Sequence, residues 1–221
     1  MRLLKSNQSR KQGSGEGGVR FQQDNCIFAG CSNYRRILDM ILPKELETDR
    51  LILRPHTQAD FEGFYTFLSD ENATRFLSFT PEEKTRQGAT AFFNTMLDSY
   101  QSTEPIFGMA ILEKGTRNYI GSCGLSALSD SQAAETVLLI LPDAWGKGYA
   151  TEVGMVLVEY AFSMPGIDSV VSFADPQHPA SRRVSEKLGM AEIGLVDHKE
   201  YPHQVVKYEL TKEAFLSETM E

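Results

Sequence analysis

The chain has 221 residues, of which 41% are hydrophobic and 24% charged, enough for one globular domain with a full core. No apolar run approaches the roughly 18–20 residues of a membrane helix, and the polar stretch 1–18 lacks the apolar centre of a secretory signal. The formal net charge of −8 is uneven, because residues 1–45 carry +4 and the remainder carries −12. An acidic domain repels nucleic acid and attracts cationic substrates such as amines, although acidic surfaces also simply keep proteins soluble.

The three cysteines, Cys26, Cys31 and Cys123, form neither an even set for disulfides nor a complete set of zinc ligands. We therefore expect no metal and no disulfide framework. A reducing, cytoplasmic location fits this composition, and we expect neither nucleic acid nor a membrane as a partner.

Residues 1–44 differ from the rest of the chain. The glycine-rich stretch 12–18 is typical of a flexible segment, and the apolar content up to residue 42 is low. We predict a flexible N-terminal extension over 1–44 and one folded domain over 45–221.

The first half of this domain is expected to combine a strand, two helices and an antiparallel hairpin. Thr57, with Asp60 three residues later, marks one helix start, and Thr80, followed by Pro81 and two glutamates, marks another. The polar residues 114–118 separate two apolar runs, which predicts a hairpin turn. In chain order the expected elements are a strand at 50–54, helices at 57–68 and 80–100, and strands at 106–112 and 119–125.

The second half alternates strands with helices. The expected elements are a strand at 135–141, a helix at 148–162, a strand at 169–174, a helix at 180–188 closed by Gly189, and a last strand at 205–210. This order predicts an α/β domain with a mixed sheet, antiparallel first and then strand–helix–strand.

The segment Trp145-Gly146-Lys147-Gly148-Tyr149-Ala150-Thr151 joins a predicted strand to a predicted helix. The first four amides of a helix have no partner within it, and this end carries roughly half a positive charge. Glycine and alanine leave room for an anion to reach these amides, so the segment predicts a phosphate or pyrophosphate site. Lys147 adds a charge contact, or is simply solvated.

Two other nucleotide-binding patterns fit less well. A Walker loop requires Gly-x4-Gly-Lys-Ser/Thr, and no stretch of the sequence matches it. The dinucleotide fingerprint requires a third glycine where Thr151 stands, within a longer series of strand–helix units. From this segment alone, a plain glycine turn stays open as the alternative.

Three segments, in the same order and spacing, resemble the GCN5-related N-acetyltransferase (GNAT) family, in particular the branch of ribosomal-protein N-terminal acetyltransferases. Residues 47–54 resemble the first strand of that branch, 145–152 its pyrophosphate loop, and 180–190 its later helix and the strand after it. The resemblance implies the GNAT fold, an α/β fold whose mixed, mostly antiparallel sheet has splayed central parallel strands flanked by helices. It also implies direct acetyl transfer from acetyl-CoA to a primary amine, with no covalent enzyme intermediate and no metal.

The same resemblance implies where acetyl-CoA binds. Pantetheine is expected along the strand before the loop, and the pyrophosphate on the amides of Gly146 to Thr151. Trp145 stands where family members commonly carry Gln or Arg, and His178 replaces an asparagine and is expected to hold the cofactor's amide groups. The implied cofactor-binding residues are Leu139, Ile140, Leu141, Trp145, Gly146, Lys147, Gly148, Tyr149, Ala150, Thr151, His178 and Ser181.

Glu135 matches the carboxylate of the family and is the predicted base. A lysine-like amine has a pKa near 10.4, so a positioned base typically contributes about 10²–10⁴-fold at neutral pH. Ser181 is the predicted hydrogen-bond donor to the leaving thiolate, and its alternative role is a helix cap. Ser185 stands where many relatives carry a tyrosine acid.

The acceptor is expected to be a protein N-terminus or a small amine, bound by a monomer or a homodimer. His198, Tyr201 and His203 lie in the loop before the last strand, which borders the acceptor in the implied fold. Because the expected tyrosine and asparagine are both replaced, a CoA-binding module without transferase activity stays open as the alternative.

Overall fold

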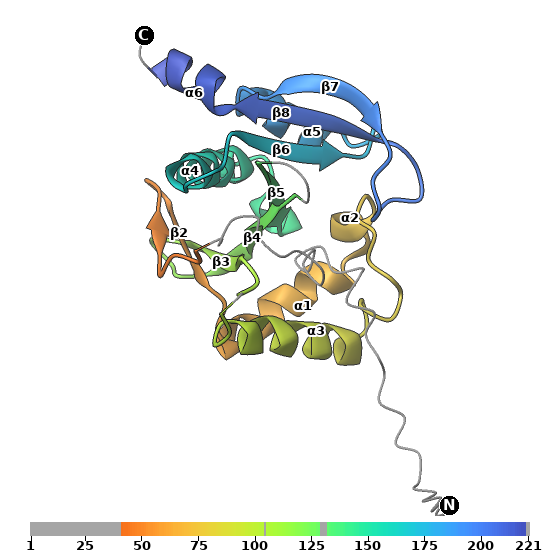
Figure 1. Cartoon of the computed structure of the whole chain (residues 1–221). Helices are drawn as coiled ribbons and strands as arrows, with labels where there is room; N and C mark the ends of the chain where they lie inside the picture. The colour runs from red at the N-terminus through yellow and green to blue at the C-terminus, as the bar shows by residue number, and fades with distance from the viewer. Residues whose placement is uncertain (1–40, 104, 129–131, 220–221) are drawn as a thin grey trace, which may run out of the picture.

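A computed structural model describes residues 41–103, 105–128 and 132–219 of the chain. Most of the predicted extension over 1–44, with Cys26 and Cys31, lies outside this part. The described residues form one sheet with helices on both faces (Figure 1).

Eight strands make up the sheet, in the order β1-β2-β3-β4-β5-β6-β8-β7. Every neighbouring pair is antiparallel except β5 and β6, which are parallel. The strands are β1 (Leu46–Glu47), β2 (Leu51–Pro55), β3 (Gly108–Glu113), β4 (Tyr119–Ala127), β5 (Ala133–Ile140), β6 (Ser169–Ala174), β7 (Ala191–Val196) and β8 (Val205–Thr211).

The parallel pair separates part of the way along its length. Pairing between β5 and β6 ends at Glu135 and Val171, whereas pairing of β5 with β4 continues to Ile140. In Figure 1, β6, β8 and β7 therefore lie together above β2, β3 and β4, with β5 between the two groups. This confirms the predicted mixed, mostly antiparallel sheet with splayed central parallel strands.

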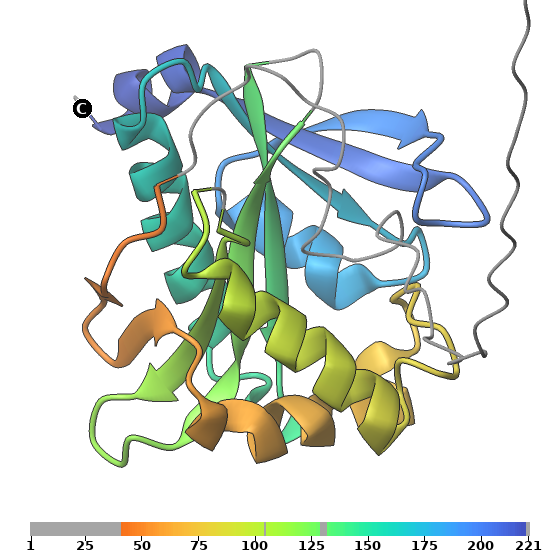
Figure 2. The ribbon, with the colours of Figure 1, turned by 60° about the horizontal axis from the view of Figure 1, so that its bottom comes forward.

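Helices cover the two faces of the sheet. On one face α1 (Phe61–Ser69) and α3 (Arg86–Ser99) lie across the strands, as Figure 2 shows, with the short α2 (Glu71–Thr74) beside them. On the other face lie α4 (Tyr149–Ser163) and α5 (Pro179–Lys187), and α6 (Lys212–Thr219) follows β8.

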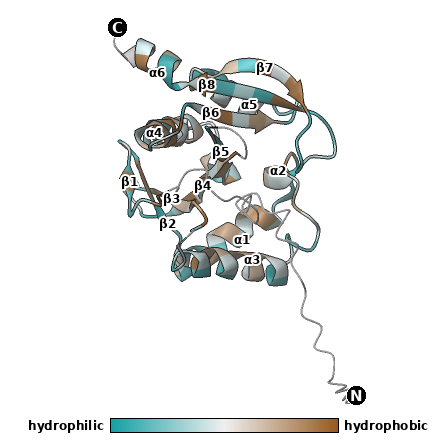
Figure 3. Cartoon of the chain, viewed as in Figure 1, coloured by the Kyte–Doolittle hydropathy of each residue, from teal (hydrophilic) through white to brown (hydrophobic). Residues whose placement is uncertain are grey.

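Alternation along β5 places its side chains in two different cores. Val137 and Leu139 pack with the apolar residues of α1 and α3, whereas Leu138 and Ile140 pack with those of α4. Figure 3 shows the apolar residues gathered on the strands in the middle of the molecule. Because Glu135 shares its face with Val137, it points toward the layer formed by α1 and α3.

The helix predicted at 80–100 begins later than expected. Thr80 and Glu83 do exchange capping hydrogen bonds, with Thr80 Oγ1 accepting from the Glu83 amide at 3.2 Å, but this turn does not continue into the helix. Instead α3 begins at Arg86, capped by Thr85, whose Oγ1 accepts from the Gly88 amide at 3.1 Å. The prediction was wrong because two capping threonines stand close together, and only tertiary packing decides between them.

Candidate functional site

The loop between β5 and α4 has the backbone shape that its glycines allow. Gly146 and Gly148 have φ angles of 72° and 80°, in the left-handed region that other residues rarely adopt. Gly148 is the N-cap of α4 and brings no side chain to cap it. The helix therefore begins with an open positive end.

The amides of this loop are available to a ligand. The first backbone bond into α4 runs from the Glu152 amide to the Gly148 carbonyl, at 3.1 Å. Among the described residues, no acceptor takes a hydrogen bond from any amide between Gly146 and Thr151. Free amides and the helix dipole together favour an anion at this position.

Beyond Glu135 a gap separates β5 from β6, and the last residues of β5 differ in whether their backbone N–H and C=O groups face this gap. The amide of Leu141 donates to the Ile120 carbonyl at 2.9 Å, and its carbonyl accepts from Ala144 at 2.9 Å. Since backbone groups alternate along a strand, those of Leu139 also face β4, and those of Ile140 face away from it. Trp145 Nε1 donates to the Ile140 carbonyl at 2.7 Å. Of the three residues expected along pantetheine, only Ile140 thus turns its backbone toward the gap.

Glu135 lies at the residue where β5 and β6 part. Its side chain is 17% exposed, and the imidazole of His198 lies beside it, with Nε2 4.0 Å from Glu135 Oε2. Burial raises the pKa of Glu135 to about 8; the carboxylate of Glu200 adds to this shift and Lys199 opposes it. A carboxylate with a pKa near neutral pH is well suited to accept a proton.

Aromatic and acidic side chains from separate segments surround Glu135. The His198 ring lies 4.5 Å from the ring of Phe173 on β6 and 5.5 Å from that of Tyr201, between ring centres. Further out, His203 Nε2 pairs with Asp175 Oδ2 at 2.8 Å. Burial lowers the pKa of His198, so this ring is neutral at neutral pH and does not cancel the charge of the carboxylates. The loop of residues 197–204 therefore lies beside Glu135.

The two serines of α5, Ser181 and Ser185, differ in their surroundings. His178 is the N-cap of this helix and its Nδ1 accepts from the Ser181 amide at 3.4 Å, so the alternative that Ser181 is the cap is wrong. Within the described part of the chain, the Ser181 hydroxyl has no hydrogen-bond partner. Ser185 is buried, with its Oγ 2.7 Å from Ser172 Oγ on β6, and is not available to a ligand.

One contact of His178 could not be read from the sequence. Its ring stacks on Phe76, with 4.4 Å between ring centres, and the Arg75 guanidinium lies 4.3 Å from the Phe76 centre. Phe76 follows the short helix α2, which Asp70 caps but which is too short for a periodic pattern and was not predicted. The segment after α2 therefore meets the start of α5 beside the predicted cofactor residues.

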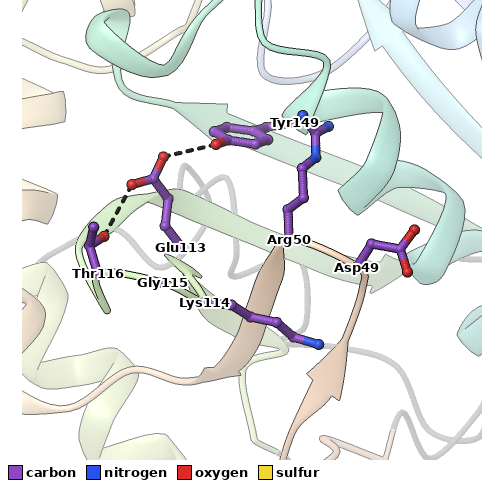
Figure 4. A pocket seen from close by; sticks show the side chains of 7 residues that line it. All are labelled: Asp49, Arg50, Glu113, Lys114, Gly115, Thr116 and Tyr149. Atoms are coloured by element: carbon purple, nitrogen blue, oxygen red, sulfur yellow. Dashed lines mark hydrogen bonds between the residues drawn. The ribbon is translucent and has the colours of Figure 1, made fainter.

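An open hollow of about 320 Å³ lies beside the first residue of α4 (Figure 4). Inside it, Tyr149 Oη donates to Glu113 Oε1 at 2.8 Å, and Thr116 Oγ1 donates to Glu113 Oε2 at 3.1 Å. The Tyr149 hydroxyl is therefore engaged on the side of β2 and β3. The lining residues are Asp49, Arg50, Glu113, Lys114, Gly115, Thr116 and Tyr149.

Two absences hold for residues 41–103, 105–128 and 132–219. No three or more His, Cys, Asp or Glu side chains in this part are grouped so that they could hold a metal ion. No helix in it combines the length and apolar character of a membrane span.

The chain is similar to a known family and to known proteins. Residues 50–191 match the family model described as "Acetyltransferase (GNAT) domain". The chain is 32% identical over 160 residues to the "Uncharacterized N-acetyltransferase YoaA" of Bacillus subtilis (strain 168), covering 72% of this chain and 88% of that protein.

Two solved structures have a similar fold. Spermidine N-acetyltransferase from Vibrio cholerae, in complex with CoA and spermine, aligns with a TM-score of 0.62 at 16% identity, covering 76% of this chain and 99% of that one. Ribosomal-protein-S5-alanine acetyltransferase from Vibrio fischeri aligns with a TM-score of 0.63 at 13% identity, covering 76% and 97%.

Proposed function

Because this chain belongs to the GNAT family of acetyltransferases, we propose that it carries acetyl from acetyl-CoA directly to a primary amine held beside Glu135. The observation that carries this proposal is the position of Glu135, a partly buried carboxylate at the residue where β5 and β6 part. Its place puts a proton acceptor at the inner end of the gap between the two strands.

The residues at the other end of this gap fit coenzyme A. The free amides of Gly146 to Thr151 offer hydrogen bonds to a pyrophosphate, and the positive end of α4 favours its charge. The backbone of Ile140 faces the gap, where an extended chain with amide groups can lie. When bound, acetyl-CoA supplies an acetyl group activated as a thioester.

Glu135 has the properties that the reaction asks of a base. The acceptor arrives as an ammonium ion, and Glu135 accepts its proton so that the nitrogen lone pair is free to form the new C–N bond. As the C–N bond forms the C–S bond breaks, the second proton of the attacking nitrogen passes to the leaving sulfur, and CoA departs as its thiol. The Ser181 hydroxyl donates a hydrogen bond to that sulfur while it leaves. With a pKa of about 8, roughly a tenth of the Glu135 side chains are ionised at pH 7, and most are at pH 9.

We propose a cationic acceptor, either a protein N-terminus or a small amine. Asp175 brings negative charge to this region, and Glu135 and Glu200 add to it in their ionised forms; the rings of Phe173 and Tyr201 can contact an ammonium ion through their faces. Both kinds of acceptor are included because the fold is similar to that of an enzyme named for spermidine and to that of one named for a ribosomal protein.

The second candidate is a CoA-binding module without transfer activity. It is favoured by one observation: Ser185, where many relatives carry a tyrosine acid, is buried against Ser172 and offers no hydroxyl to the leaving group. Under this alternative the 145–151 loop binds CoA, while Glu135 and Ser181 take no part in chemistry.

One experiment separates the two candidates. The full chain is incubated with acetyl-CoA and a panel of peptides, polyamines and amino acids, and release of the CoA thiol is followed. We expect turnover with at least one cationic primary amine. Binding of acetyl-CoA in calorimetry without thiol release from any acceptor would favour the binding module, and absence of binding would contradict both.

A further inference from the structure

Arg50 and Glu152 connect the residue before β2 to the first turn of α4, although 102 positions separate them in the sequence. Arg50 Nε donates to Glu152 Oε2 at 2.7 Å, and the Arg50 amide donates to Glu152 Oε1 at 3.0 Å. The Thr48 hydroxyl also donates to Glu152 Oε1. Side chain and backbone thus bind both oxygens of a single carboxylate.

The same guanidinium also reaches the 145–151 loop itself. Arg50 Nη1 donates to the Lys147 carbonyl at 3.0 Å, and the guanidinium lies 4.7 Å from the centre of the Tyr149 ring. Figure 4 shows the Arg50 side chain extending from the start of β2 to the edge of that ring. Arg50 therefore contacts the residues on both sides of Gly148, the N-cap of α4.

Charge explains why this arrangement matters for an anion. A carboxylate in the first turn of a helix stabilises the helix, but it has the same sign of charge as a pyrophosphate bound there. Burial alone would raise the pKa of Glu152, and the hydrogen bonds from Thr48 and Arg50 outweigh this and lower it, so the group is ionised at neutral pH. Arg50 compensates that charge and leaves the positive end of α4 to the ligand.

We infer that Arg50 and Glu152 are positioning residues for coenzyme A: they hold the 145–151 loop in its binding shape and compensate the one carboxylate in the first turn of α4. The inference rests on the proposed function, because it deepens the account of the same cofactor site. Neither residue needs to touch the reacting atoms. The expected signature is a change in the KM for acetyl-CoA with little change in kcat.

The test compares single and double variants. Arg50→Gln should raise the KM for acetyl-CoA about tenfold, with kcat at saturation changed less than about twofold, because it leaves Glu152 uncompensated beside the anion. Arg50→Lys keeps the positive charge, but a single ammonium group cannot donate both to Glu152 and to the Lys147 carbonyl as the guanidinium does. A rise of about threefold in the KM for acetyl-CoA is therefore expected. In the double variant Arg50→Gln with Glu152→Gln, the KM should fall back to about threefold above the unsubstituted chain.

The matched control is another arginine–glutamate pair. Arg86 and Glu62 join α3 to α1 on the exposed surface, and neither belongs to the site. Arg86→Gln should leave the KM for acetyl-CoA unchanged. A KM within twofold of the unsubstituted chain in Arg50→Gln, or a double variant at least as impaired as Arg50→Gln, would overturn the inference.

A readout without ligand keeps this test separate from the proposed function. Lys147 is exposed on the loop, and trypsin cleaves a segment faster the more freely it moves, so the cleavage rate after Lys147 reports how firmly the loop is held. Cleavage at Lys147 should be several-fold faster in Arg50→Gln than in Arg86→Gln, with both variants folded by thermal unfolding. If the unsubstituted chain did not bind acetyl-CoA, the proposed function would fail, and an unchanged cleavage rate would separately overturn the role of Arg50 in holding the loop.

Discussion

Two glutamates of this chain, Glu152 and Glu135, show how differently the proposed cofactor side and the proposed acceptor side are built. Glu152 receives hydrogen bonds from Thr48 and Arg50, which lower its pKa against the effect of burial. Glu135 has only His198 at 4.0 Å, and burial raises its pKa to about 8. The carboxylate of Glu152, which accepts several hydrogen bonds, fits the positioning role proposed for it, whereas that of Glu135 fits the proposed exchange of a proton.

The two regions also differ in what they present to a ligand. The cofactor side presents backbone amides of consecutive residues, and its side chains face away into ion pairs and hydrogen bonds. The acceptor side presents side chains brought from β5, β6 and the loop 197–204. Substitutions on the first side should therefore alter binding of acetyl-CoA, and substitutions on the second should alter turnover.

The largest effect is expected from a charge placed in the loop. Gly148→Glu forces a residue with a side chain into a φ of 80° and adds a negative charge at the N-terminus of α4. We expect the affinity for CoA, measured by calorimetry, to fall more than about 100-fold. Gly115→Ala, in the open turn where an added Cβ meets no atom within 4 Å, is the control and should bind normally. Normal binding by Gly148→Glu would remove the loop from the cofactor site.

Turnover, not binding, should respond to Glu135→Gln. The variant cannot accept the proton of the ammonium ion, so kcat should fall about 100-fold while the KM for acetyl-CoA stays the same. In the unsubstituted chain kcat/KM should rise with pH through an inflection near 8, because the base acts in its ionised form. The same inflection in Glu135→Gln would assign it to another group.

Ser181→Ala should have a smaller effect on the acceptor side. Loss of a hydrogen bond to the leaving sulfur is expected to lower kcat about three- to tenfold, with the unfolding temperature unchanged because His178 is the helix cap. Ser185→Ala is the contrasting variant, since it removes a buried hydrogen bond to Ser172 and should lower stability by about 1 kcal/mol. Equal kcat in Ser181→Ala and the unsubstituted chain would leave Ser181 without a role in transfer.

The smallest effects, on stability, should have opposite signs for the two glutamates. Because the pKa of Glu135 is raised on folding, its contribution to stability is complete below its ordinary pKa and is lost as the pH rises toward 8. Glu135→Gln should therefore raise the unfolding temperature at pH 8 by about 3–8 °C, and change it little at pH 4.5.

Glu152 should behave in the reverse way. Its pKa is lowered on folding, so its contribution is present above the ordinary pKa and is lost as the pH falls. Because Arg50 is half exposed, Glu152→Gln should cost only about 0.5–1 kcal/mol at pH 8, and less at pH 4. Scanning calorimetry of both variants across this pH range measures the two signs together, and equal signs would contradict the comparison.

Much of the fold was predictable because its signals are local. The strand of residues 169–174 was predicted with the bounds that β6 has, and the helix predicted at 148–162 differs from α4 by one residue at each end. The short elements β1, α2 and α6 carry too few residues for a periodic pattern. The start of α3 depended on the choice between two capping threonines, which the sequence does not make.

By itself, the sequence determined the residues whose backbone makes a helix start open to an anion, because Gly146 and Gly148 act through their own φ angles. It could not determine that Arg50 pairs with Glu152, nor that, of Leu139, Ile140 and Leu141, Ile140 is the one that turns its backbone to the gap. Those features depend on strand register and on contacts between residues about 100 positions apart. Tertiary structure also decided which glutamate accepts several hydrogen bonds, since a pKa depends on the partners that folding brings within hydrogen-bond distance.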